Sequence, residues 1–434
     1  MRRSIVHEGA ENLKYEIREI VSVAHKVREL GQEITWENIG DPNQKGEELA
    51  PWIREILHEL LDEPLSYAYC DTAGVPETRE FLAANVNERD GSCVNVSADD
   101  IIFFNGIGDA VARIYGFLKR EARILGPSPA YSTHSSAEAA HSGYSHVTYE
   151  LDPSQGWMPD LYDIRNKVKY NDSIAGILLL SPDNPTGAVY PRNLLEEIVK
   201  IAQEHDLFII ADEIYTHIIY EGYPNLHMSQ WIQDVPALSL RGISKEYPWP
   251  GARCGWIEVL NREKDANFST YVESLLAAKR LEVCSTTLPQ MSIPRVFADD
   301  RYAGHLKRRA GIFNDRANEA ATALHGCSSI IANKPGGAFY FTVMFKEKVL
   351  NDQQTLPIEN AAVREHIETI VQGVSPDKRF VYYLMGATGI VVVPLTGFQS
   401  NHAGFRFTLL ENDDTKRAWI FKTLRECIDT YVAS

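Results

Sequence analysis

Four polar motifs follow apolar runs of the chain, and together they contain an amine, a carboxylate, a guanidinium and a glycine-rich turn. They are NGIGDA (105–110), SPDNPTG (181–187), ADEIY (211–215) and SKEYPWPGARCG (244–255). Singly, each motif has an ordinary interpretation. Asn-Pro and Thr-Gly are typical of surface turns, and a lone Lys245, Arg253 or Asp212 is most often a surface or capping residue. Their shared position after candidate strands is what indicates a common site.

The apolar runs from residue 101 onward alternate with amphipathic stretches, which is the pattern of βαβ units. Continuous runs such as GILLLS (176–181) and LFIIAD (207–212) indicate parallel strands buried on both faces. Apolar residues between these two runs recur at helical spacing: Leu194, Leu195, Ile198, Ile201 and Ala202. RCGWIEV (253–259) is expected to run back along the sheet. Ligands are therefore expected at the carboxyl ends of the strands.

The flanks of this region have a different pattern. Residues 10–31 predict a helix that ends at Gly31, and residues 315–434 mix helical stretches with strands such as AFYFTVMF and FRFTLL. We expect an α/β fold with a large domain (49–314), whose mainly parallel sheet is flanked by helices. A small α+β domain should form from both chain ends, 1–48 and 315–434.

Composition narrows the partners. The chain has 43 Lys and Arg against 59 Asp and Glu, a formal charge of −16, which argues against nucleic acid as a partner. We find no apolar run long enough to span a bilayer and no signal-peptide core, so a cytoplasmic protein that does not bind membranes is expected. The six cysteines show no metal-ligand spacing, so we expect no metal site and reduced, mostly buried thiols.

The joint order of the motifs resembles the fold-type I pyridoxal phosphate (PLP) enzymes of the class I/II aminotransferase family. The resemblance covers nearly the whole chain, from about Tyr15 to Arg406. It is carried by IGDP (39–42), YAYCDTAGVPETREFLA (67–83), NGIGDA, PAYSTH (129–134), NPTGAVY, ADEIY, SKEYPWPGARCGW, PGGAFY (335–340) and FRFTLL. An SK pair followed by GxRxG, together with NPTG and DEIY, is a specific combination.

The resemblance implies roles around the cofactor ring. PLP is an electron sink held as a Schiff base to a lysine, and Lys245 matches that lysine. As general base and acid, Lys245 would move the proton between the substrate Cα and the cofactor. Asp212 would pair with the pyridine nitrogen, while Asn184 and Tyr215 would donate hydrogen bonds to the ring oxygen O3′. A working lysine must be neutral, which desolvation or a nearby cation favours by lowering its pKa.

The resemblance also implies a phosphate site. The amides of Ile107 and Gly108 open a predicted helix, whose N-terminus suits a dianion. Arg253 supplies a planar guanidinium for the phosphate oxygens. Ser244, beside the lysine, completes the predicted contacts.

Further matches concern the surroundings of the cofactor. Tyr131 matches the aromatic residue that stacks on the PLP ring. His134 matches a histidine that supports the pyridine-binding carboxylate in some relatives, although an ordinary loop histidine is equally plausible. Tyr69, five residues before Gly74, matches a tyrosine that reaches the PLP phosphate of a neighbouring subunit, which implies a homodimer. One departure is Gly242, where many relatives have a phosphate-binding Ser or Thr.

Substrate recognition requires a partner for the α-carboxylate. Arg406 in FRFTLL matches the carboxylate-binding arginine of the family. Asn184 and the backbone at Gly40 would complete this pocket. Tyr15 would fold over the substrate from the N-terminal segment.

The detailed pattern is most similar to bacterial alanine (glutamate:pyruvate) aminotransferases, which catalyse L-alanine plus 2-oxoglutarate to pyruvate plus L-glutamate. Valine, aromatic or aspartate donors remain alternatives, as does a PLP-dependent lyase or decarboxylase on the same fold. A PLP-binding transcription regulator is a third class. Only about 35 residues precede IGDP, too few for a helix-turn-helix module.

Overall fold

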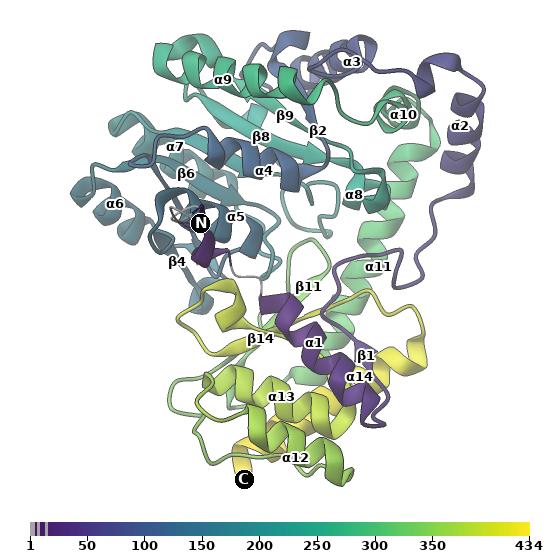
Figure 1. Cartoon of the computed structure of the whole chain (residues 1–434), viewed down its shortest axis with the longest axis vertical. Helices are drawn as coiled ribbons and strands as arrows, with labels where there is room; N and C mark the ends of the chain where they lie inside the picture. Colours follow the sequence, from purple (N-terminus) through teal and green to yellow (C-terminus); the bar gives the residue numbers. More distant parts are fainter. Residues whose placement is uncertain (1–4, 7–8, 14–15) are drawn as a thin grey trace.

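The computed structural model describes residues 5–6, 9–13 and 16–434. Its largest element is a sheet of eight strands in the upper part of Figure 1. In spatial order, the strands are β2 (Ile101–Phe104), β9 (Gly255–Leu260), β8 (Ala237–Gly242), β7 (Phe208–Asp212), β6 (Ile174–Leu180), β3 (Arg123–Ser128), β4 (Thr148–Asp152) and β5 (Met158–Pro159). Strands β8, β7, β6, β3 and β4 pair in parallel, whereas β9 runs antiparallel between β2 and β8.

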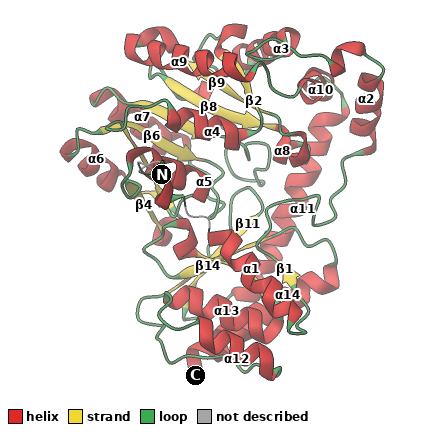
Figure 2. Cartoon of the chain, viewed as in Figure 1, coloured by secondary structure: helices red, strands yellow, loops and turns green. Residues whose placement is uncertain are grey.

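Both faces of this sheet are buried, which explains its continuous apolar strands. In β6, Ile177 and Leu179 pack into one hydrophobic cluster, and Leu178 and Leu180 pack into another on the opposite face. Helices cover both faces (Figure 2). The helices of this part are α2 (Pro51–Leu61), α3 (Pro76–Glu88), α4 (Ile107–Gly116), α5 (Ser132–Ser142), α6 (Leu161–Tyr170), α7 (Arg192–Glu204), α8 (Ile243–Glu246), α9 (Ala266–Glu282) and α10 (Thr287–Phe297).

A third hydrophobic cluster joins the two ends of the chain and forms the core of the small part. The strands of the small part are β1 (Thr35–Trp36), β10 (Ile330–Ile331), β11 (Tyr340–Phe345), β12 (Ile390–Val391), β13 (Val393–Pro394) and β14 (Gly404–Thr408), and its helices are α1 (Glu16–Glu29), α12 (Ala361–Ile370), α13 (Pro376–Thr388) and α14 (Asp414–Ala433). Strand β1 pairs with β12, and α1 contacts α13, so the N-terminal segment packs on the C-terminal region (Figure 1). The predicted fold class is therefore confirmed.

The long helix α11 (Arg301–Leu324) connects the two parts (Figure 1). Tyr302, near its start, packs into the core of the large part, whereas Phe313 and Leu324 pack into the core of the small part. The predicted domain boundary after residue 314 falls inside this helix. Because this one helix contributes to both cores, it marks no sharp end of the large domain, and the boundary stays a prediction.

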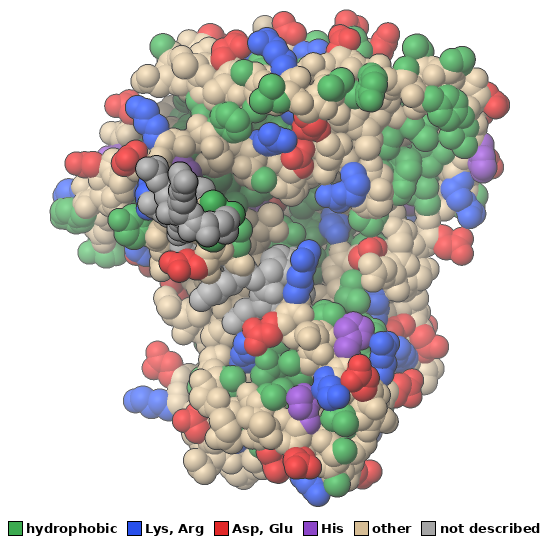
Figure 3. Space-filling model, in the orientation of Figure 1, with side chains coloured by type: hydrophobic (Ala, Val, Ile, Leu, Met, Phe, Trp, Pro, Cys, Tyr) green, Lys and Arg blue, Asp and Glu red, His purple; other side chains and the backbone are tan. Residues whose placement is uncertain are grey.

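Three observations concern the chain as a whole. On the face shown in Figure 3, acidic and basic side chains are interspersed. No helix among the described residues is long and apolar enough to cross a bilayer. The expectation of mostly buried cysteines was wrong: Cys254 and Cys327 are buried, Cys93 is exposed, and the others are partly exposed. Cysteine is small enough to be accommodated at loop and surface positions as well as in cores.

Candidate active site

A cavity of about 370 Å³ lies at the carboxyl edge of the large sheet and is closed by residues from the N-terminal segment and the small part. Eleven of the thirteen predicted site residues line it: Gly40, Ile107, Gly108, Tyr131, Asn184, Asp212, Tyr215, Ser244, Lys245, Arg253 and Arg406. Residues separated by up to 366 positions therefore meet at one place.

The strand topology explains this convergence. Asp212 is the last residue of β7, and Lys245 lies in the short helix α8, directly after β8. Asn184 follows the end of β6. Arg253 precedes β9, and because β9 is antiparallel to β8, its beginning lies at the same edge as the other strands' ends. This is where α/β sheets commonly bind ligands.

Lys245 lines this cavity, and its pKa is shifted by burial and by charged neighbours. Its Nζ donates a hydrogen bond to the carbonyl oxygen of Gly40 at 2.5 Å. Desolvation, together with the Arg253 and Arg406 guanidiniums, lowers the pKa of the amine to about 8, whereas Asp41 opposes the shift. A lysine amine with this pKa is partly neutral near physiological pH and can accept a proton or attack a carbonyl carbon.

Asp212 is buried at the base of the cavity. Its Oδ2 lies 3.1 Å from Nε2 of the fully buried His134, and its Oδ1 accepts a hydrogen bond from the Ile214 amide at 3.2 Å. Since an ionised carboxylate only accepts hydrogen bonds, Nε2 of His134 is the donor. The predicted support of Asp212 by His134 is thus present as a direct contact. A carboxylate held in this way can face a cationic ring nitrogen.

Two tyrosines share a hydrogen bond across the cavity wall. The hydroxyls of Tyr215 and Tyr340 are 2.7 Å apart. Burial raises the pKa of Tyr215 well above its ordinary value, and the neighbouring Tyr340 adds to the shift. The Tyr215 hydroxyl therefore keeps its proton and can donate to an anionic oxygen in the cavity.

An anion cradle forms where α4 begins. The first amides of a helix have no carbonyl partner within it, and those of Ile107 and Gly108 line the cavity. The preceding Gly106 adopts φ +81°, and a Cβ there would lie 2.5 Å from Nη2 of Arg253. Arg253 itself is in the left-handed region, at φ +49°, which is uncommon for a non-glycine residue. The backbone thus places a guanidinium beside a helix N-terminus.

Tight strand packing accounts for the unusual Gly242. A Cβ at this position would lie 3.0 Å from the carbonyl oxygen of Cys254 and 3.2 Å from the Cα of Gly255 on β9. A serine or threonine would therefore crowd the neighbouring strand. Hydroxyl groups are still available, because Ser244 and Thr133 both line the cavity.

At the other end of the cavity lies Arg406, whose side chain is almost fully buried. Its Nη1 donates to Oδ1 of Asn184 at 3.4 Å, and its Nη2 donates to the backbone oxygen of Asn38 at 2.5 Å. The ring of Tyr340 lies 4.6 Å from the guanidinium carbon. A buried guanidinium held on two sides is a suitable partner for a carboxylate.

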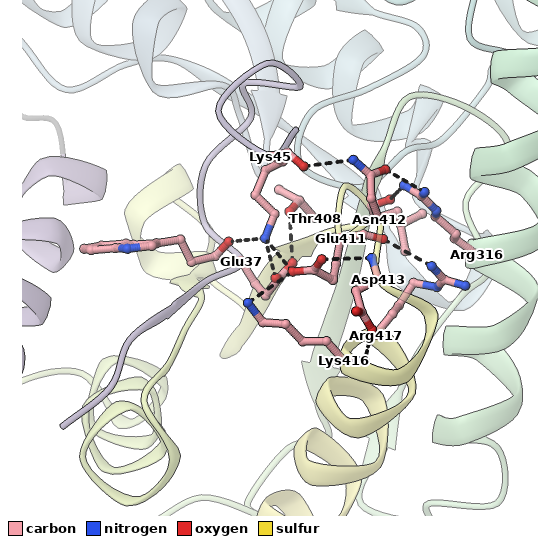
Figure 4. A network of polar contacts seen from close by, with 11 residues as sticks. Glu37, Lys45, Arg316, Thr408, Glu411, Asn412, Asp413, Lys416 and Arg417 are labelled. Carbon is pink, nitrogen blue, oxygen red and sulfur yellow. Dashed lines mark hydrogen bonds and ion pairs between the residues drawn. The ribbon is translucent and has the colours of Figure 1, made fainter. Parts of the chain in front are cut away.

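The loop that carries Gly40 is held by a polar network at the small part (Figure 4). Lys45 Nζ contacts Glu37 at 2.7 Å and Glu411 at 3.4 Å, and Glu37 also accepts a hydrogen bond from Thr408 on β14. Lys416 of α14 reaches the same Glu411 at 3.4 Å. This network fixes the loop next to Arg406, two residues before Thr408.

Among the described residues, Tyr69 is the predicted site residue that does not line the cavity, and it is 85% exposed on the single chain. The predicted Tyr15 lies outside the described residues. Sequence reasoning missed Asn38, Thr133 and Tyr340 as cavity residues. Thr133 and Tyr340 lie in the motifs PAYSTH and PGGAFY, and Asn38 directly precedes IGDP. The available signal in the sequence was therefore proximity to a matched residue.

The comparisons with known proteins identify the family. The model of the family described as aminotransferase class I and II matches residues 36–419, most of the chain. The chain belongs to the class I and II aminotransferases. An uncharacterized aminotransferase of Methanocaldococcus jannaschii is 55% identical over 432 residues, covering 100% of both chains. Glutamate-pyruvate aminotransferase AlaA of Escherichia coli is 30% identical, over 80% of this chain and 85% of its own.

Solved structures agree with this assignment. The alanine aminotransferase from Pyrococcus furiosus superposes with a TM-score of 0.83 at 25% identity, covering 99% of this chain and 100% of its own. The expected resemblance is confirmed: this aminotransferase is a PLP-dependent enzyme that transfers amino groups.

The cavity of this aminotransferase fits PLP. The cofactor needs an amine for its aldehyde, a carboxylate for its ring nitrogen and a cradle for its phosphate. Lys245, Asp212 and the α4 N-terminus with Arg253 offer these three groups within one cavity. Gly108 leaves room beside the cradle, because a Cβ there would have no neighbour within 4 Å. In the described part of the chain, no group of three His, Cys, Asp or Glu side chains is placed to hold a metal ion.

Proposed function

We propose that this aminotransferase converts L-alanine and 2-oxoglutarate to pyruvate and L-glutamate. The observation that carries the proposal is the buried Arg406, which shares one cavity with the Lys245 amine. The choice of substrates is supported by the relatives named glutamate-pyruvate aminotransferase and alanine aminotransferase.

We assign the cofactor ring to the large part of the molecule. When bound, PLP supplies the electron sink that allows a bond at the substrate Cα to break. Asp212, held by His134, would pair with the ring nitrogen, and Asn184 and Tyr215 would donate hydrogen bonds to the ring oxygen. Tyr131 would stack on the ring.

The phosphate belongs in the cradle at the start of α4. The amides of Ile107 and Gly108 would donate to its oxygens, with the Arg253 guanidinium and the Ser244 hydroxyl as further donors. Thr133 is available where relatives use a hydroxyl at the position of Gly242.

Lys245 is the catalytic residue of this proposal. Because its pKa is lowered to about 8, the amine has a neutral fraction near physiological pH. In that form Nζ removes the proton from the substrate Cα and later returns a proton. The hydrogen bond to Gly40 keeps the amine on the side where the substrate carboxylate binds.

The substrate end is built around Arg406. Its guanidinium pairs with the α-carboxylate, with Asn184 and the Gly40 backbone at its side. Among the described residues, the arginines that line the cavity are Arg253, assigned to the phosphate, and Arg406. Closure by Tyr15 stays a prediction.

The active unit is proposed to be a homodimer. Tyr69 is 85% exposed, and Leu65 and Tyr67 nearby are also largely exposed. Exposed large apolar side chains that lie together commonly mark a protein interface. In a dimer, Tyr69 would reach the phosphate bound in the partner subunit.

A donor panel tests the proposed reaction. L-Alanine, L-valine, L-aspartate and L-tyrosine are each assayed with 2-oxoglutarate, and glutamate, ammonia and CO₂ are measured. L-Alanine is expected to give a kcat/KM at least about tenfold above the other donors, with one glutamate per pyruvate. Preference for another donor would refute the alanine assignment, and release of ammonia or CO₂ in place of glutamate would indicate a lyase or decarboxylase.

A further inference from the structure

Asn38 is a buried amide without a hydrogen-bond partner. Its side chain is 2% exposed, and neither Oδ1 nor Nδ2 has a partner among the described residues. Leaving such a group unpaired costs about 1–3 kcal/mol, and unpaired buried groups are rare in native proteins. An unpaired amide of this kind beside a cavity can be paired by a ligand that binds there.

Asn38 lies at the substrate end of the cavity, and it lines the same space as Lys245. Its own backbone oxygen accepts the hydrogen bond from Nη2 of Arg406 at 2.5 Å, so the residue adjoins the guanidinium. The other terminal nitrogen of Arg406 donates to the amide of Asn184 at 3.4 Å. The Asn38 backbone and the Asn184 side chain therefore flank one guanidinium.

We propose that the Asn38 side chain is a substrate-binding residue whose Nδ2 donates a hydrogen bond to the carboxylate of the amino acid or 2-oxo acid. The inference rests on the proposed function, in which Arg406 pairs with that carboxylate. A carboxylate has about four acceptor sites, of which a bidentate guanidinium uses two. A neutral amide adds a donor without adding charge near Lys245, so the lysine pKa is not disturbed.

Truncation of the Asn38 side chain should distinguish a role in substrate binding from a role in stability. A residue that only supports the fold loses contacts when it is truncated, and the protein becomes less stable. Asn38 makes no side-chain hydrogen bond in the described structure, so its removal sacrifices none. Asn43 in the same loop is the matched opposite: its Nδ2 donates to the backbone oxygen of Glu47 at 2.9 Å, and it does not line the cavity.

The experiment compares Asn38→Ala, Asn38→Asp and Asn43→Ala as holoenzymes. For Asn38→Ala we expect KM for L-alanine and for 2-oxoglutarate to rise about tenfold, with kcat and the thermal midpoint near wild type. Asn38→Asp has the same shape but places a carboxylate beside Arg406, so its KM should rise further than that of Asn38→Ala. Asn43→Ala should keep both KM values and lose some thermal stability.

The outcomes decide the inference. Wild-type KM values in Asn38→Ala would overturn it, as would a loss of stability and kcat at unchanged KM. Arg406→Lys is measured alongside: if its KM values stay at wild type, the carboxylate site fails and the inference fails with it. If only Asn38→Ala stays at wild type, the proposed function stands and the inference alone is overturned. Should L-alanine not react, the best donor of the panel replaces it.

Discussion

The Lys245 amine shows how a single side chain acquires its chemistry from its surroundings. An ordinary lysine has a pKa near 10.5 and is almost fully charged at pH 7. Desolvation and the guanidiniums of Arg253 and Arg406 lower the pKa of Lys245 to about 8, against the pull of Asp41. A base is most useful when its pKa lies near the working pH. The two arginines that we propose to bind anions therefore also lower the pKa of the lysine.

This shift predicts the pH dependence of cofactor capture. Only the neutral amine attacks the PLP aldehyde, so the rate at which cofactor-free enzyme binds PLP should rise with pH and level off above about pH 9, with a midpoint near 8. The rate is followed by the visible absorption band of the lysine-bound cofactor, and Lys245→Ala should show no such band. A midpoint near 10.5 would contradict the prediction.

The same shift has a consequence for stability. Between about pH 8 and 10.5 the unfolded chain binds more protons at this lysine than the folded chain does. The free energy of unfolding should therefore rise with pH over this window. Burial of the charged Lys245 amine lowers it below about pH 8, and this cost is fully relieved above about pH 10.5.

At the scale of elements, the start of α4 depends on one glycine. Gly106 is at φ +81°, and a Cβ there would lie 2.5 Å from the Arg253 guanidinium. Gly106→Ala should cost about 1–2 kcal/mol in backbone strain and displace Arg253, which weakens PLP binding about tenfold. Gly116, at the other end of α4, has no neighbour within 4 Å of its Cβ position, so Gly116→Ala is the control. Equal PLP affinities of the two variants, measured by titration, would disprove the cradle.

The connecting helix α11 contacts both α8, which carries Lys245, and the loop that carries Gly40 through one side chain. Nη1 of the buried Arg309 donates to the backbone oxygens of Lys245 at 2.7 Å and Glu246 at 2.8 Å. Its Nη2 contacts Glu47, in the loop that carries Gly40, at 3.1 Å. Arg309 thus holds α8 and the loop that carries Gly40 in a fixed arrangement. Its charge also helps to lower the pKa of Lys245.

Loss of Arg309 should therefore affect both stability and activity. Arg309→Leu is expected to lower the free energy of unfolding by about 2–3 kcal/mol, less than for a fully buried pair because Glu47 is partly exposed. The kcat should fall as well, since α8 loses its support. Urea unfolding and steady-state assays measure both, with the exposed Arg308→Leu as the neighbouring control. If Arg309→Leu had the same free energy of unfolding and the same kcat as Arg308→Leu, Arg309 would have no such positioning role.

At the scale of the molecule, the site lies where the two parts and both chain ends meet. The net charge of −16 describes the surface, yet Lys245, Arg253 and Arg406 line one cavity. A cavity with three cationic groups suits a phosphate and a carboxylate together. The bulk charge excluded a polyanion as the general partner but had no bearing on this local concentration of positive charge.

The proposed homodimer can be tested by mixing two impaired variants. Lys245→Ala lacks the catalytic amine, and Tyr69→Ala lacks the predicted phosphate contact to the partner. If Tyr69 serves the neighbouring site, subunits exchanged between the two proteins should form hybrids with one intact site, and activity should recover to about a quarter of wild type. If Tyr69 acts within its own chain, mixing should give no recovery. Sedimentation confirms the oligomeric state of each sample.

The sequence by itself determined the fold class, the return strand β9 and the family, because buried strands and turn motifs are local patterns. Most residues that line the cavity from the large part lie at or just after the ends of strands, and parallel strands bring their carboxyl ends to one edge. Arg253 instead precedes the antiparallel β9, whose beginning lies at that same edge. These positions could therefore be expected from chain order alone.

Only the tertiary structure decided the rest. The contact between Arg406 and the Asn38 backbone joins positions 368 residues apart, and no local pattern encodes it. The same holds for the pKa of Lys245, which depends on charges contributed by four separate segments. The unpaired amide of Asn38 and the crowding at Gly242 depend on segments that are distant in the sequence and adjacent in the fold. Only the tertiary structure could show them, because burial and packing are properties of the folded surroundings and not of the residue.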